Sequence, residues 1–219
     1  MTFSNKANSS FLSQSNATLV NVNNDTPMLT RLQTRSYGTA RLQAGADKIA
    51  LAQSLARQHV EKRQEKLATY VKLQAKKQEV HDRCVSFSRS LRHHFKNEPD
   101  ILKELGLDNR IERRNADFIE QMYHLYNRAL TGEAAKARLT TEGIEETMMQ
   151  SDHALIEEYV RDRQDYVRQS GDCQKLVELR EKAIRDAKAW MAGLKTTLKG
   201  LYRDNPQALE SVGIMVRNA

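Results

Sequence analysis

The sequence has few of the residues that build tight turns and β-structure. Its 219 residues include only 9 Gly and 3 Pro, too few for the many turns of a β-sandwich or barrel. Aromatic residues make up 6% of the chain and charged residues 29%, a balance typical of helical bundles. The sequence therefore predicts an all-α fold.

Long apolar runs and cysteine-rich segments are also missing. No stretch reaches the roughly 18 consecutive apolar residues that a membrane-spanning helix needs, and the first residues lack the basic start and apolar run of a signal peptide. The two cysteines, Cys84 and Cys173, are too few for a disulfide scaffold and fit a reducing compartment. We expect a cytoplasmic protein without a membrane span.

No motif with a known catalytic mechanism is present. A glycine-rich phosphate loop, a nucleophile elbow and a His-Glu-x-x-His pair are all absent. His81 and Cys84 are one helical turn apart, but the second pair that a tetrahedral metal site needs is missing. Two Glu and His pairs have the spacing of ordinary surface contacts on a helix, and they are Glu120 with His124 and His153 with Glu157. We expect no enzymatic activity, no metal and no cofactor.

Residues 1–40 differ in composition from the rest of the chain. Half of them are Ser, Thr, Asn or Gln, and such a segment cannot bury enough apolar surface to fold alone. Spaced Phe, Leu, Met and Tyr side chains nevertheless look like anchors for another surface, and Thr18–Val22 has local strand propensity. This composition predicts a polar, extended N-terminal arm that contacts a neighbouring subunit.

Residues 41–96 are expected to form the first of two long helices. They contain no Pro and a single Gly, Gly45, and an apolar stripe with steps of three and four residues ends at Leu91. Residues 41–97 hold 13 Lys and Arg against 5 Asp and Glu. The candidate basic patch consists of Arg57, Lys62, Arg63, Lys66, Lys72, Lys76, Lys77 and Arg83. Acidic residues interrupt it at helical-neighbour spacings, so nucleic acid is only the alternative partner.

The second long helix is expected over residues 144–203. From Ile144 to Leu201, 13 of 17 positions in steps of three and four residues are apolar, which predicts a helix on the order of 90 Å long with coiled packing. Ser170-Gly171-Asp172 is a competing signal, because Gly followed by an Asp cap would make a hairpin. We favour a continuous helix, since the apolar phase runs through Gly171 unbroken.

Both long helices end in the same kind of sequence. An aromatic residue, Phe95 or Tyr202, is followed by a Pro, an aliphatic residue and a Gly, and the Pro and Gly pairs are 107 residues apart. Pro can begin a short helix, and Gly can supply a left-handed C-terminal residue. We interpret this similarity as a weak internal repeat, and convergent helix-capping chemistry is the alternative explanation.

The C-terminal end also resembles a known group of proteins. The residues that carry the resemblance are Trp190, Leu194, Leu198, Asp204-Asn205-Pro206-Gln207, Leu209-Glu210, Val212-Gly213-Ile214 and Val216-Arg217. They are similar to the C-terminus of an uncharacterised group of bacterial helical-bundle proteins, over about residues 80–219. These motifs cap helices, and the resemblance implies no function.

The expected architecture is a long antiparallel helical hairpin or bundle. Its parts are the arm (1–40), a helical domain (41–219) with long helices at 41–96 and 144–203, a helical head (97–143) and a C-terminal cap (204–219). Because the head covers only part of the long helices, we expect a homo-oligomer or polymer, a structural subunit of a filament, sheath or shell. The candidate subunit interface consists of Trp190, Leu176, Leu179, Phe3, Phe11, Leu12, Leu19 and Val20.

Overall fold

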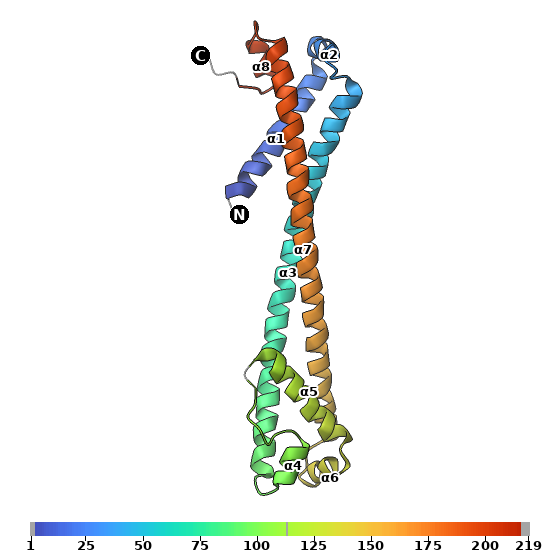
Figure 1. Cartoon of the computed structure of the whole chain (residues 1–219), viewed down its shortest axis with the longest axis vertical. Coiled ribbons are helices and arrows are strands. Elements are labelled where there is room, and N and C mark those ends of the chain that lie inside the picture. Colours follow the sequence, from blue (N-terminus) through green and yellow to red (C-terminus); the bar gives the residue numbers. More distant parts are fainter. Residues whose placement is uncertain (1–2, 113, 216–219) are drawn as a thin grey trace. The chain divides into compact units, whose positions relative to one another are not determined.

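A computed structural model describes residues 3–112 and 114–215, with side chains from residue 6 onward. This part of the chain forms eight helices and no strand, which confirms the all-α prediction (Figure 1). The helices are α1 (Phe3–Asn24), α2 (Thr26–Gln33), α3 (Thr39–His94), α4 (Pro99–Glu104), α5 (Asn115–Thr131), α6 (Glu133–Thr141), α7 (Glu146–Leu201) and α8 (Gln207–Ser211).

The two long helices lie close to their predicted bounds. Each of α3 and α7 is 56 residues long, and α7 passes through Gly171 without a break. Contacts pair rising residue numbers on α3 with falling numbers on α7, such as Tyr70 with Tyr166 and Arg83 with Asp152. The helices are therefore antiparallel, as the hairpin prediction required.

Two compact units divide the chain. Unit 1 contains residues 1–64 and 171–219, and unit 2 contains residues 65–170. Both α3 and α7 contribute to each unit, and each unit has a hydrophobic core of its own. The division therefore does not follow the predicted border at residue 40.

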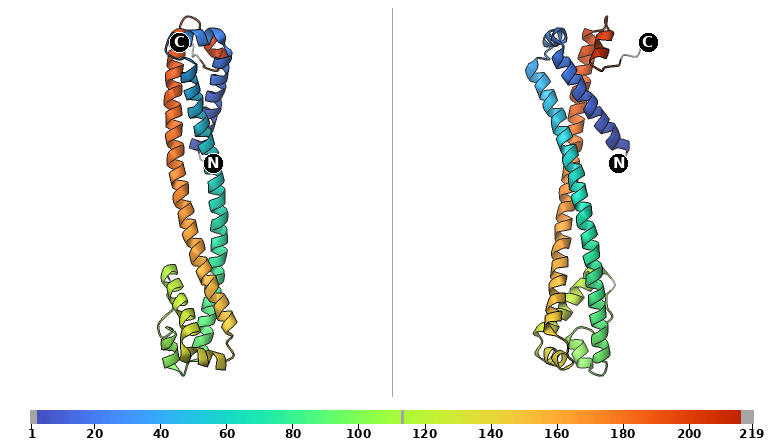
Figure 2. Two further views of the ribbon diagram at one scale, coloured as in Figure 1. Left: turned by 90° about the vertical axis from the view of Figure 1, so that its right-hand side faces the viewer. Right: turned by 180° about the vertical axis from the view of Figure 1, so that it is seen from behind.

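The structure corrects the prediction of an extended arm. Residues 3–24 and 26–33 are helical and belong to unit 1, where α1 and α2 lie beside α3 and α7 (Figures 1 and 2). Their buried side chains join a core shared with α3, α7 and α8. The residues of 1–40 that are buried in this core are Leu12, Leu19, Val22, Met28, Leu32 and Tyr37.

Tertiary burial explains why a segment of weak helix formers is helical. Leu12, Leu19 and Val22 share one face of α1 because they are spaced by seven and three residues. Between α1 and α2, the Asp25 side chain accepts a hydrogen bond from the Met28 N–H at 2.9 Å. Together with Pro27 in the first turn of α2, this N-cap fixes where the new helix begins.

Unit 2 is built from the C-terminal part of α3, the helices α4, α5 and α6, and the N-terminal part of α7. The helical head was predicted for residues 97–143, and α4, α5 and α6 occupy that range. Phe118, Met122, Leu125 and Ala129 of α5 are buried in the core of unit 2, together with Leu91 of α3 and Phe95 in the turn after it. These four residues of α5 are spaced by three and four positions, so they form one apolar face of the helix, and this is the face that packs.

The two predicted caps form with the same hydrogen-bond pattern. Gly106 and Gly213 have left-handed φ angles of 74° and 77°. The Leu107 N–H donates to the Leu102 carbonyl at 2.7 Å, and the Ile214 N–H donates to the Leu209 carbonyl at 2.9 Å. Both helix ends are thus closed by a Gly and an aliphatic residue, as expected of this motif.

Candidate interaction surfaces

The α3–α7 seam of unit 2 becomes polar toward the unit's boundary. No described residue of 65–72 or 160–170 is buried. Tyr70 and Tyr166 contact each other with ring centroids 5.7 Å apart, and the Lys66 ammonium lies 5.6 Å from the Tyr166 ring. Lys76 bridges from α3 to Glu158 of α7 at 2.8 Å. Aromatic and ionic contacts therefore hold this part of the helix pair in place of a buried apolar core.

Three large aliphatic side chains are exposed beside this seam. Leu67, Val71 and Val167 are 63%, 61% and 63% exposed. Leu67 and Val71 each follow a seam residue of α3 by one position, and Val167 follows Tyr166 of α7 in the same way. A step of one residue turns the side chain by about 100°, and because the helices are antiparallel, it turns toward the same side of the pair. These residues therefore form one surface, the exposed stripe.

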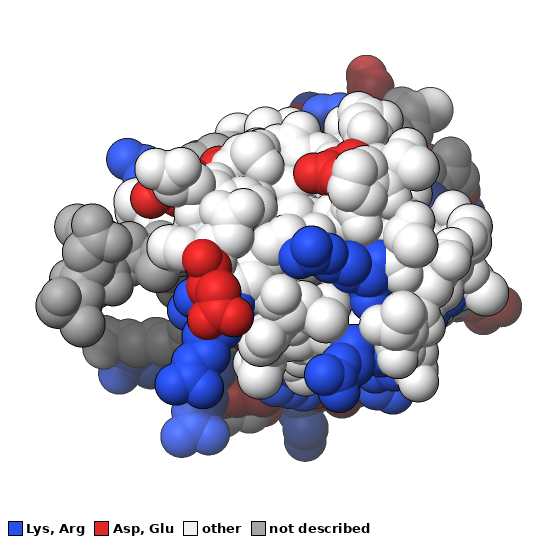
Figure 3. Space-filling view, turned by 90° about the horizontal axis from the view of Figure 1, so that it is seen from above, with Lys and Arg blue, Asp and Glu red and all other residues white. Residues whose placement is uncertain are grey.

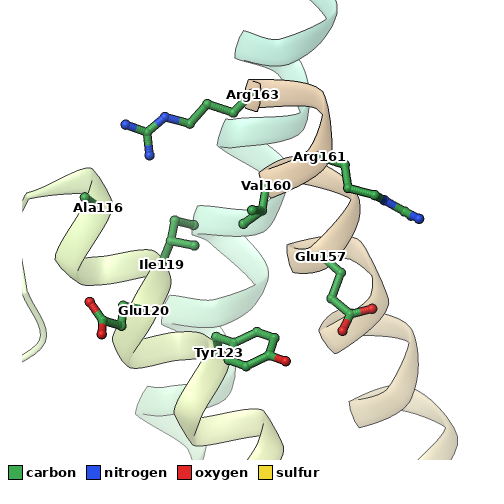
Figure 4. A pocket seen from close by; sticks show the side chains of 8 residues that line it. All are labelled: Ala116, Ile119, Glu120, Tyr123, Glu157, Val160, Arg161 and Arg163. Atoms are coloured by element: carbon green, nitrogen blue, oxygen red, sulfur yellow. The ribbon is translucent and has the colours of Figure 1, made fainter. Parts of the chain in front are cut away.

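A groove between α5 and α7 lies on the same side of α7. Its volume is about 520 Å³, and Ile119 and Val160 face each other across it (Figure 4). Val160 precedes Val167 by seven residues, so the two side chains lie on one face of α7. The exposed stripe and this α5/α7 groove therefore lie on the same side of unit 2.

Charged residues of both signs border the groove. Glu120 extends from α5, and Glu157, Arg161 and Arg163 extend from α7 (Figure 4). All four residues are exposed. Next to the groove, the His153 ring contacts the Tyr123 ring at 4.8 Å, and its Nδ1 lies 3.8 Å from Glu157. The predicted spacing of His153 and Glu157 thus produces an ordinary contact along a helix.

A buried polar network connects three helices inside unit 2. Asp152 of α7 is 6% exposed, and it accepts hydrogen bonds from the Tyr126 hydroxyl and from Arg83, both at 3.0 Å. Burial, together with the charge of Asp152, raises the pKa of the Cys84 thiol to about 12, and burial likewise raises the pKa of Tyr126. A protonated, buried thiol is unreactive, so this network serves packing.

In unit 1 the seam contains a different polar contact. His59 of α3 and Arg180 of α7 are joined by Nδ1 and Nη1 at 3.0 Å. Burial lowers the pKa of His59, and the charges of Arg180 and Arg63 lower it further. The Arg180 Nε is buried and has no hydrogen-bond partner. His59 therefore remains neutral at physiological pH, and its Nδ1 can accept a hydrogen bond from Arg180.

The residues of the predicted subunit interface fall into different environments. Leu12 and Leu19 are buried inside unit 1, and Phe11 and Trp190 pack partly against the same core. Val20 and Leu179 are 50% and 55% exposed, and Leu176 is half-buried. The side chain of Phe3 lies outside the described residues. Four of these eight residues therefore pack against the core of unit 1.

The surroundings of Trp190 explain why it was predicted to face a neighbouring subunit although its ring packs inward. It lies on a stripe beside the main apolar face of α7, but a glycine on α3 leaves room for its ring. A Cβ at Gly45 would lie 2.2 Å from the indole, and Tyr37 packs edge-on against it at 6.2 Å. The absence of a side chain at Gly45 is what allows the indole to pack inward.

The predicted basic patch is divided between the units and is partly neutralised. Arg57, Lys62 and Arg63 belong to unit 1, and the other members, Lys66, Lys72, Lys76, Lys77 and Arg83, belong to unit 2. Lys76 and Arg83 form ion pairs with acidic residues of α3 and α7. The ion pairs of Lys76 and Arg83 weaken the nucleic-acid alternative. Seen from the end that carries α2 and α8, most of that end is uncharged (Figure 3).

Other kinds of site receive no support from the described part of the chain. No three or more His, Cys, Asp or Glu residues there are placed to hold a metal ion. No helix among the described residues is long and apolar enough to cross a membrane. Comparison of the chain with protein-family models, curated proteins and solved structures found no match.

The exposed stripe was not among the residues predicted from the sequence. The predicted apolar stripes run along the seam, where Tyr70 and Tyr166 lie, and the exposed stripe lies one position further along each helix. The signal was present, because an aliphatic residue comes directly after Lys66, Tyr70 and Tyr166. A second apolar column one step from a seam indicates a surface available to a third helix.

Proposed function

We propose that this protein is a non-enzymatic assembly subunit that binds a second copy of itself through the exposed stripe and the α5/α7 groove. The observation that carries the proposal is the exposure of Leu67, Val71 and Val167 on one side of the helix pair. Large aliphatic side chains gathered on one surface are typical of an interaction site. The free thiols of Cys84 and Cys173 fit a reducing, cytoplasmic setting for such an assembly.

The charges beside the groove favour a second copy as the partner. In a contact with two-fold symmetry, each surface meets an identical surface in reverse. Glu120 and Glu157 of one copy can then face Arg161 and Arg163 of the other, and the same pairing occurs twice. Because the surface carries both signs, it can complement itself.

Light scattering of the full-length chain tests whether this surface drives assembly. Leu67→Ser combined with Val71→Ser should shift the particle mass toward the monomer, because it removes apolar area from the interface. Leu51→Ser is the matched control, since Leu51 is 55% exposed but belongs to unit 1. An unchanged mass for the double variant, or an equal loss in the control, would contradict the proposal.

A charge exchange tests the symmetric contact itself. Glu157→Arg and Arg163→Glu should each weaken self-association, because each variant places like charges opposite each other. Mixing the two variants should restore it, since a mixed dimer recovers an opposite-charge pair at both positions. Failure of the mixture to associate, while each variant keeps wild-type helix content, would show that these residues do not face each other.

Salt titration separates this function from the nucleic-acid alternative. Binding to DNA would weaken steeply between low and physiological salt through counterion release. Association by apolar helix packing should persist over that range. Tight DNA binding together with a monomeric wild-type chain would favour the alternative.

A further inference from the structure

The structure displays a helix-binding face on unit 1, occupied by α1. The α1 helix contacts three other helices: Gln53 of α3 donates to the Leu12 carbonyl at 3.5 Å, Lys188 of α7 donates to Asn8 at 2.8 Å, and Asn21 donates to the Ser211 carbonyl of α8 at 3.4 Å. We call this surface of α3, α7 and α8 the docking face. It combines apolar contact with polar groups placed along the occupant.

The occupant has little tendency to be helical when it is not docked. Twelve of the 22 residues of α1 are Ser, Thr or Asn, which favour turns and caps over helix interiors. Lys6 is the single charged residue in α1, so side-chain ion pairs cannot support the helix. Helix formation in α1 is therefore coupled to docking.

The docked face of α1 is also imperfectly matched. Ser15 and Thr18 are buried between the apolar anchors, at 1% and 3% exposure. The Ser15 hydroxyl has no hydrogen-bond partner, and an unsatisfied buried hydroxyl opposes docking. By contrast, α2 contains no buried side-chain polar atom without a hydrogen-bond partner, and Met28 and Leu32 are fully buried. The weakly held part of the chain thus ends at Asp25, which joins α1 to α2.

We infer that the docking face also accepts α1 from a second copy, so that two chains exchange this helix when they associate. The inference rests on the proposed self-association and specifies a contact that it uses. An exchanged helix places its anchors, Leu12, Leu19 and Val22, against the same surface of α3, α7 and α8 that it leaves in its own chain. Exchange of an identical element is a low-cost route to dimers. Pro27 prevents α1 and α2 from merging into one helix, so Asp25 serves as the hinge.

A peptide of residues 3–24 tests the docking face directly. The receiving protein is the full-length Leu19→Asp variant, whose own α1 is expelled because Leu19 is 2% exposed. We expect saturable binding with a gain of peptide helicity. Wild-type protein should bind the peptide at least about tenfold more weakly, because its tethered α1 competes at high effective concentration. Full-length Val20→Asp, changed on the exposed side of α1, should behave like the wild type.

Peptide variants identify the chemistry of the site. A Ser15→Ala peptide should bind more tightly than the natural peptide, and a Leu19→Asp peptide should not bind. Absence of peptide binding to a Leu19→Asp protein that retains wild-type Trp190 fluorescence would overturn the inference.

Light scattering connects the peptide result to assembly. If helices are exchanged, full-length Leu19→Asp should lose mass relative to the wild type, and Val20→Asp should not. Equal masses for Leu19→Asp and the wild type would overturn exchange while leaving assembly through the exposed stripe intact. A wild-type chain that is monomeric at all concentrations would instead contradict the proposed function, whatever the peptide does.

Discussion

Arg180 of α7 donates from Nη1 to Nδ1 of His59 on α3 across 3.0 Å, with the imidazole in its neutral form. A protonated His59 has no acceptor nitrogen and would place a third positive charge beside Arg180 and Arg63. Burial and these two charges lower the pKa of His59 below its usual 6.5. The contact therefore depends on pH.

Acidification should destabilise unit 1 through His59. Because the folded pKa lies below the unfolded pKa, the folded state binds fewer protons, so stability is complete above about pH 6.5 and falls as the pH decreases toward the folded pKa. Thermal melting of the wild type from pH 7.5 to pH 5 should therefore decline more steeply than melting of His59→Gln, which retains an acceptor and does not titrate there. Superimposable profiles would show that His59 does not contribute.

The same substitution at two glycines should have opposite effects. Gly171→Ala should stabilise the protein by up to about 1 kcal/mol, because Gly171 is mid-helix and a Cβ there meets no atom within 4 Å. Gly45→Ala should destabilise it by about 1–3 kcal/mol through overpacking, since its Cβ would lie 2.2 Å from Trp190. Urea denaturation measures both. A destabilising Gly171→Ala would argue against a continuous α7.

Removing one hydroxyl should weaken unit 2. Tyr126→Phe keeps the ring, which stacks on Phe87 at 4.9 Å, but removes the hydrogen bond to the buried Asp152 carboxylate. We expect a loss of about 1–3 kcal/mol, measured by chemical denaturation. Tyr123→Phe, on the groove side of α5, is the control and should change the free energy of unfolding by less than about 0.5 kcal/mol. Equal effects would mean that the network is not specifically stabilising.

Truncation of two leucines of α7, one buried and one exposed, should lower the free energy of unfolding by different amounts. Leu194 is fully buried in unit 1, whereas Leu179 is 55% exposed. Leu194→Ala should cost about 2–5 kcal/mol by creating a cavity, and Leu179→Ala should stay within about 0.5 kcal/mol. A small loss at Leu194 would show that the C-terminal half of α7 does not pack as described.

The long helices were predictable because their signal is local. The absence of Pro, the apolar steps around Leu91 and Leu198, and the left-handed glycines at 106 and 213 are all properties of neighbouring residues. They determine where a helix begins, which face is apolar and where it ends. These features therefore gave the bounds of α3 and α7 to within a few residues.

The arm and the interaction surface were not predictable in the same way, because both depend on contacts between distant residues. The α1 segment is helical because Leu12 and Leu19 pack into a core that α7 and α8 complete. The sequence of residues 1–40 does not indicate that these two helices pack against it. Trp190 faces inward because of Gly45, 145 positions away. The direction of Leu67 and Val167 likewise became clear only when the register of the helix pair was known.

The division of the chain into two units has a consequence for the order of folding. Unit 2 is a single continuous segment, residues 65–170, whereas unit 1 needs residues from both ends of the chain. On a ribosome, α1 and α2 emerge before unit 2, but Met191, Leu194 and Ile214 of their core are made after it. Unit 2 can close while α1 is still without its partners. Every newly made chain thus passes through a stage in which α1 lacks its partners on α7 and α8, while an older copy already has the complete docking face.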